Sequence, residues 1–185
     1  MPASKMLFIG AHPDDVEIGC AGTVARYIRE GRRCHFITLT RGEATANPRI
    51  RAVEAQRAAS ELGADLTLLS YPDTKLRTVA ELVRVIDGLA SRIKPESVFI
   101  HSSLDLNEDH QVASRASQIA CRRISNIYEY TTPETPPSFA ANLYVKLSKA
   151  DVQMKAKALK HYSSQSVKTG GNRYVESYRV VKQTQ

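Results

Sequence analysis

The chain has 185 residues, of which 42% are hydrophobic and 24% charged, and its formal net charge is +7 at pH 7. These values are typical of one soluble globular domain with a sizeable core, and we expect a single domain over residues 1–185. The first residues, "MPASKMLFIG", hold too short an apolar run for a secretory signal or a membrane span. Three widely spaced cysteines argue against a disulfide framework or a zinc–thiolate cluster, so a cytoplasmic location is expected.

The basic charge is scattered along the chain in short groups such as "REGRR" and "CRR". It suits a solvated surface or an anionic small substrate, such as a phosphate-bearing one. Aromatic residues make up only 6% and do not alternate with the basic ones, so no nucleic-acid partner is expected. The sequence leaves the oligomeric state open, and a homo-oligomer is compatible with it.

Short apolar runs and amphipathic segments alternate along the first two thirds of the chain. The pattern predicts strands at 5–11, 33–43, 65–71 and 97–103, and helices at 20–31, 48–64, 78–95 and 109–123. After residue 124 it predicts strands at 126–132, 142–148 and 174–182, and a helix at 149–164. The repeated alternation indicates an α/β fold of the Rossmann-like, doubly wound type, with a mostly parallel sheet and helices on both faces.

Polar side chains follow two of the predicted strands at the points where they end. The first strand runs into "HPDD", and the fourth runs into "HSSLDLNEDH". In a doubly wound sheet, ligands bind at the carboxyl ends of the strands where the strand order reverses, usually between the first and fourth strands. We therefore expect the two segments to meet there, which brings together His12, Asp14, Asp15, Asp105, Asn107, Asp109 and His110.

Two histidines and one carboxylate form a catalytic zinc site, and a spare carboxylate nearby can act as a general base. The same ligand types also suit a non-haem iron oxygenase. A simpler reading takes "PDD" as a turn and Asp109 as a helix N-cap. A basic module that binds an anionic partner and has lost catalysis is a further alternative.

Taken together, "AHPDDVEIGCAGT" and "DLNEDHQ" resemble the PIG-L/LmbE-like family of metal-dependent N-acetylglucosaminyl deacetylases. The segments "TRGEATANPRIRAVEAQRAASELGA", "FAANLYVKLS" and "KALKHYSSQ" are also similar to that family, so the resemblance covers most of the chain. It implies a Rossmann-like zinc-dependent hydrolase that removes acetyl from an N-acetylated amino sugar or its conjugate. Fe²⁺ or another divalent metal is the alternative to zinc.

By motif match, the resemblance implies that His12, Asp15 and His110 are the metal ligands. Asp14 would be the general base, and later the acid that protonates the leaving amine. Arg51 would lie near the hydroxyl or phosphate groups of the substrate.

One position departs from the family pattern. Many members carry a histidine three positions before the last ligand, proposed to stabilise the oxyanion, where this chain has Asn107. An amide N–H can also donate to an oxyanion, so we expect Asn107 to be catalytic. We further expect Asp109 to orient its neighbours and Asp105 to shape the substrate crevice. His101 is either a support for the site or an ordinary hydrogen-bonded core histidine.

Overall fold

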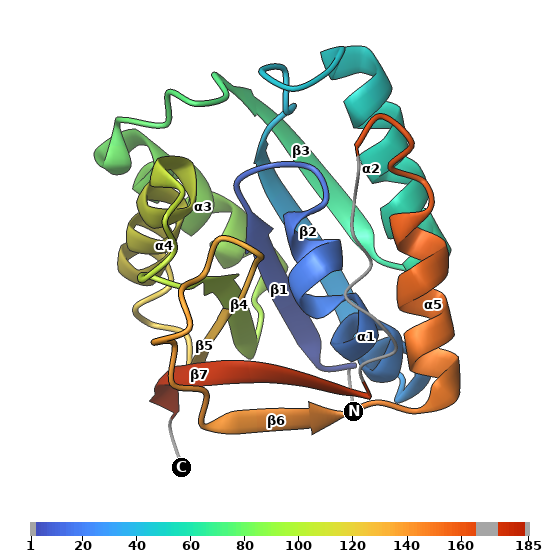
Figure 1. Ribbon diagram of the computed structural model, residues 1–185. Coiled ribbons are helices and arrows are strands. Elements are labelled where there is room, and N and C mark those ends of the chain that lie inside the picture. Colours follow the sequence, from blue (N-terminus) through green and yellow to red (C-terminus); the bar gives the residue numbers. More distant parts are fainter. Residues whose placement is uncertain (1–2, 166–173, 184–185) are drawn as a thin grey trace.

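The computed structural model describes residues 3–165 and 174–183. At its centre is a seven-stranded sheet with the strand order β3-β2-β1-β4-β5-β7-β6 (Figure 1). The strands are β1 (Lys5–Gly10), β2 (Arg33–Thr40), β3 (Asp65–Tyr71), β4 (Ser97–His101), β5 (Asn126–Tyr130), β6 (Leu143–Lys146) and β7 (Val175–Gln183). The helices are α1 (Asp15–Arg29), α2 (Pro48–Leu62), α3 (Val79–Ile93), α4 (Glu108–Ala120) and α5 (Lys149–Leu159).

The five strands β1 to β5 are parallel, whereas β7 is antiparallel to β5 and β6 is antiparallel to β7. Strand β1 lies between β2 and β4, so the strand order reverses there. The predicted doubly wound α/β fold with a mostly parallel sheet is confirmed. The reversal point lies beside β4, where the two polar segments were expected to meet.

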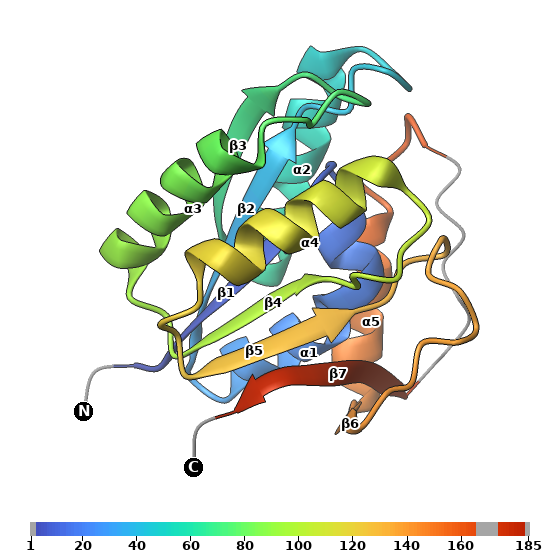
Figure 2. The same cartoon turned by 90° about the vertical axis from the view of Figure 1, so that its left-hand side faces the viewer.

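Both faces of the sheet are buried under helices, as the unbroken apolar runs of its strands require. Met6 and Phe8 of β1 belong to a core that includes residues of α1, α2 and α5. Leu7 and Ile9, which alternate with them, belong to a second core with residues of α3 and α4. Figure 2 shows α3 and α4 together in front of the sheet, on the opposite side from α1, α2 and α5.

Two helix boundaries differ from the predicted ones by five residues, and the others by three residues or fewer. Helix α1 begins at Asp15 rather than at residue 20, because the polar "HPDD" turn leads directly into it. Helix α5 ends at Leu159 rather than at residue 164. The residues after it form a turn that is hydrogen-bonded to Glu17 of α1 and Glu54 of α2. Within the described residues, no helix has the length and apolar character needed to cross a membrane.

Candidate metal centre

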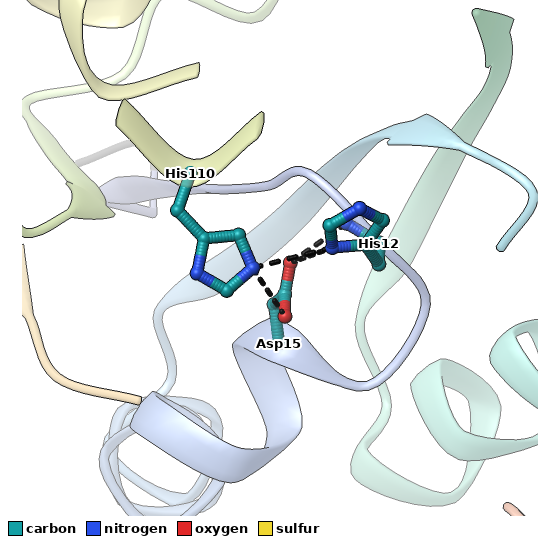
Figure 3. A group of neighbouring side chains, drawn as sticks. All are labelled: His12, Asp15 and His110. Carbon is teal, nitrogen blue, oxygen red and sulfur yellow. Dashed lines mark hydrogen bonds and ion pairs between the residues drawn. The ribbon is translucent and has the colours of Figure 1, made fainter. Parts of the chain in front are cut away.

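The ends of β1 and β4 bring three side chains together at the point where the strand order reverses (Figure 3). His12 Nδ1 lies 3.2 Å from His110 Nε2. The Asp15 carboxylate lies next to both rings. Its Oδ2 is 3.5 Å from His12 Nδ1, and its Oδ1 is 3.3 Å from His110 Nε2. One ligand atom from each residue lies within 4.8 Å of the others, which is compact enough to surround one cation.

The backbone of the "HPDD" turn separates the two adjacent aspartates. Asp14 is the N-cap residue of α1 and has φ 96°, in the left-handed region that non-glycine residues rarely adopt. Asp15 begins the helix, and its Oδ2 accepts a hydrogen bond from the His12 backbone N–H at 2.7 Å. The turn therefore directs Asp15 towards the histidines, while Asp14 Oδ2 lies 3.4 Å from a terminal nitrogen of Arg51.

The outer ring nitrogens of both histidines face carboxylates. His12 Nε2 lies 3.0 Å from Asp73 Oδ1 and 3.3 Å from Asp109 Oδ2. His110 Nδ1 lies 3.1 Å from Asp105 Oδ1. When these outer nitrogens carry the protons, the inner nitrogens present lone pairs to each other and to Asp15. A cation between them relieves that repulsion, and orienting carboxylates of this kind are typical of histidines that bind metal ions.

The electrostatics of the cluster favour positive charge. Burial lowers the pKa of His12, but hydrogen bonds to Asp109, Asp15 and Asp73 outweigh it and raise this pKa to about 12. Burial is likewise outweighed at His110, where Asp15 and Asp105 raise the pKa to about 10. Protons thus supply the positive charge when no metal is bound, and a metal ion must displace them. Two imidazoles and one carboxylate fit zinc, which takes nitrogen and oxygen ligands.

Asp105 lies beneath His110 and is fully buried. Besides His110, it accepts hydrogen bonds from the hydroxyl groups of Thr132 and Thr135 and from the Asn107 backbone N–H. This position suits a support for His110, whereas the sequence analysis expected Asp105 to shape the substrate crevice. His101 is a second support, because its ring stacks on His110 at 4.0 Å and its Nε2 lies 3.1 Å from Asp15 Oδ2.

Asn107, not Asp109, is the N-cap of α4, so this detail of the simpler sequence reading is wrong. Asn107 Oδ1 accepts from the backbone N–H groups of Asp109 at 2.9 Å and His110 at 3.3 Å. Asp109 instead accepts from the backbone N–H groups of Thr74 and Leu76. Because the amide oxygen of Asn107 is used by the cap, its Nδ2 group is the end that remains available to donate.

A cavity of about 680 Å³ opens over this centre, and Asp14, Arg51 and Asn107 line it together with the three candidate ligands. Burial raises the pKa of Asp14 to about 7, helped by the Asp15 carboxylate and opposed by the Arg51 guanidinium. Arg51 is itself buried and also donates to the Pro13 carbonyl oxygen at 2.5 Å. The cavity therefore holds a carboxyl group whose pKa is near neutrality beside a candidate metal site, as general acid–base chemistry requires.

Asp73 is the residue that the sequence analysis missed. It lies in "YPDT", just after β3, where the pattern indicated only a turn. Its Oδ2 accepts from the Ala44 backbone N–H at 2.9 Å, which leaves Oδ1 to face His12. The available signal was its position, since β3 is parallel to β1 and its carboxyl end lies at the same edge of the sheet.

Comparison with known proteins places the chain in a family. Residues 7–121 match the family model described as PIG-L: GlcNAc-PI de-N-acetylase. The chain belongs to this family. The uncharacterized deacetylase YaiS of Escherichia coli is 32% identical over 169 residues, which cover 86% of this chain and 90% of that protein.

Two further proteins are similar to this chain, one by structure and one by sequence. The crystal structure of the conserved protein TT1542 from Thermus thermophilus matches with a TM-score of 0.87 and 28% identity, over 97% of this chain and 95% of that one. The 4-oxalmesaconate hydratase of Pseudomonas putida is 27% identical over 75% of this chain and 61% of its own length. The family membership and the deacetylase relative identify this protein as an enzyme of the amidohydrolase type.

Proposed function

We propose that the protein is a zinc-dependent deacetylase that hydrolyses the acetamide group of an N-acetylated amino sugar or of its conjugate. The convergence of His12, Asp15 and His110, with Asp14 beside them in the same cavity, is the observation that carries this proposal. The family description, which names an N-acetylglucosamine conjugate, supports the substrate class. A cytoplasmic location is part of the proposal, and the three buried free cysteines are compatible with it.

His12, Asp15 and His110 would hold the zinc ion. Zinc in such a site polarises a carbonyl group and lowers the pKa of a coordinated water to about 7. Asp14 takes the proton from the attacking water as the carbon–oxygen bond forms. When the carbon–nitrogen bond breaks, Asp14 returns that proton to the leaving amine, and the products are acetate and the free amino sugar. A pKa near 7 suits a group that performs both transfers.

The negative charge that develops on the acetyl oxygen needs a hydrogen-bond donor. We assign this role to the Nδ2 group of Asn107, because Asn107 lines the cavity and its amide oxygen is engaged in capping α4. Asp109 and Asp105 orient the two histidine ligands from behind. Arg51 lowers the pKa of Asp14 and faces the substrate in the cavity.

The deciding experiment is a screen of N-acetyl sugars and their conjugates with the zinc-loaded protein, detecting the released amine. Release that depends on zinc and is lost in Asp14→Asn would support the proposal. The hydratase relative makes 4-oxalmesaconate a necessary second substrate in the screen. Turnover of that compound with no amine released from any acetylated sugar would replace deacetylation with hydration. Activity that requires iron and oxygen would favour the oxygenase alternative.

A further inference from the structure

The segment that follows α5 is hydrogen-bonded to α2 through one buried carboxylate, that of Glu54. Glu54 Oε1 accepts from the Ser164 backbone N–H at 2.8 Å and from the Ser163 hydroxyl at 3.1 Å. Glu54 Oε2 accepts from the Ser164 hydroxyl at 2.6 Å. Burial raises the pKa of Glu54, but these hydrogen bonds outweigh it and lower the pKa below its usual value. The carboxylate is therefore charged, and bonds to a charged acceptor are stronger than neutral ones.

Tyr162, the residue just before the two serines, makes a second set of contacts with α1 and α2. The Tyr162 hydroxyl donates to Glu17 Oε1 of α1 at 2.8 Å, and the Arg51 guanidinium lies 5.6 Å from the centre of the Tyr162 ring. Tyr162 and Glu17 are both buried. Because this turn is held from both α1 and α2, the position of the next residue, Gln165, is closely determined.

Gln165 lies on the wall of the cavity that contains the metal centre. Its Nε2 donates to the Thr45 hydroxyl oxygen at 3.1 Å, and the Thr45 hydroxyl donates to the Gly42 carbonyl oxygen. Within the described part of the chain, this is the one hydrogen bond of the Gln165 side chain. A second N–H and the carbonyl oxygen of that amide can therefore still bond to a ligand.

We propose that Gln165 is a specificity-determining residue whose amide, held beside Thr45 by Glu54, hydrogen-bonds a hydroxyl group of the sugar that carries the acetamide. The inference rests on the deacetylase function proposed above. A neutral amide offers both a donor and an acceptor, which matches a sugar hydroxyl better than a charged substituent. Glu54 is a positioning residue in this arrangement, because it acts on the substrate through Gln165.

The test compares two acetamides that differ in their hydroxyl groups. N-acetylglucosamine carries them, and N-cyclohexylacetamide presents the same acetamide on a six-membered ring without them. Dissociation constants are measured by calorimetry on the zinc-loaded Asp14→Asn chain, so that binding is read without turnover. Gln165→Ala should weaken N-acetylglucosamine binding roughly two- to tenfold, as expected for one neutral hydrogen bond, and leave N-cyclohexylacetamide unchanged.

Gln56→Ala is the matched control, because Gln56 is an exposed glutamine of α2 outside the cavity and should alter neither constant. Equal weakening of both acetamides by Gln165→Ala would overturn the proposal, since it would reveal a general distortion of the site. No change in either constant would overturn it as well.

The Glu54 step is tested by a double-mutant cycle in the same background. Glu54→Ala, or Ser164→Ala if that variant folds poorly, should reproduce the selective loss seen in Gln165→Ala. Combining the Glu54 and Gln165 changes should add nothing further. Glu61→Ala is the matched control. Glu61 is also in α2, and its Oε2 lies 3.4 Å from His161 Nε2, so it contacts the same turn at a residue other than the two serines. Fully additive effects, or normal binding in both the Glu54 and Ser164 variants, would overturn the positioning role.

This experiment separates two kinds of failure. Absence of zinc-dependent acetate release by the unmodified chain, with every acetylated sugar tested, would refute the proposed function. The calorimetric comparison of the two acetamides would still decide whether Gln165 forms a hydrogen bond with a hydroxyl group of the ligand.

Discussion

Asn107 has an observed role as a helix cap and a proposed role in catalysis, and substitutions can separate the two. Its Oδ1 caps α4 through two backbone N–H groups, and its Nδ2 is the proposed oxyanion donor. Asn107→Asp keeps an oxygen for the cap and removes the donor. Asn107→Ser also keeps a capping oxygen and adds no charge, and its shorter side chain places no donor at the position of Nδ2. Asn107→Ala removes both functions. The three variants together distinguish helix stability from catalysis.

The expected magnitudes differ enough to be measured separately. Loss of one oxyanion donor typically lowers kcat by about 10² to 10³, or about 2.7 to 4 kcal/mol of transition-state stabilisation. Loss of an N-cap costs about 1 kcal/mol of folding stability, which shifts the Tm of a chain of this size by about 2 to 4 °C. Asn107→Asp and Asn107→Ser should therefore lose kcat with little change in Tm, whereas Asn107→Ala should lose both.

The assays are steady-state release of amine from the best substrate in the screen, thermal unfolding, and zinc content. Zinc content should stay at one per chain in the Asp and Ser variants, because both keep a capping oxygen for the His110 backbone N–H and leave the three ligand side chains unchanged. The assignment of Asn107 as the oxyanion donor would be refuted if both variants kept kcat within about tenfold of the unmodified chain, because losing a donor usually has a much larger effect. A loss of zinc in both would assign the defect to the displacement of His110 instead.

The remaining predictions concern the metal and the general base. Asp14→Asn should retain zinc and lose most activity, whereas His110→Ala should lose zinc. Elemental analysis measures the zinc content of both variants, alongside the rate. Full activity in Asp14→Asn would exclude Asp14 as the general base. The plot of log kcat/KM against pH should fall on the acid side as Asp14 becomes protonated. Because the Arg51 guanidinium lowers the pKa of Asp14, Arg51→Met should move that fall to higher pH, and an unmoved profile would contradict the assignment. Asp73→Asn should weaken zinc binding about 10- to 100-fold by releasing the outer nitrogen of His12, measured by competition with a chelator; unchanged affinity would show that Asp109 alone suffices.

Most of the fold could be predicted because its signals are local. The apolar runs of β1 to β5 and the amphipathic helices between them carry the periodicities of their own secondary structures. Parallel strands joined by helices allow few arrangements, so the reversal between β1 and β4 could be expected from the alternation together with the usual strand order of doubly wound sheets. The early start of α1 could not be predicted in the same way, because the turn before it depends on tertiary contacts. Asp14 has a left-handed conformation and lies against Arg51, which is 37 positions later in the chain.

By itself, the sequence determined which residue types stand at the carboxyl ends of β1 and β4, and so predicted a site with two histidines and a carboxylate there. The resemblance to the PIG-L/LmbE-like family implied that His12, Asp15 and His110 are the ligands. Only the tertiary structure decided which neighbours support them. Asp73 comes from the end of β3, and Asp105 is buried under His110 by hydroxyl groups that follow β5. Gln165 reaches the cavity because Glu54, 111 positions earlier, holds the turn before it. These contacts join residues distant in the chain, and their geometry depends on packing that no local pattern encodes.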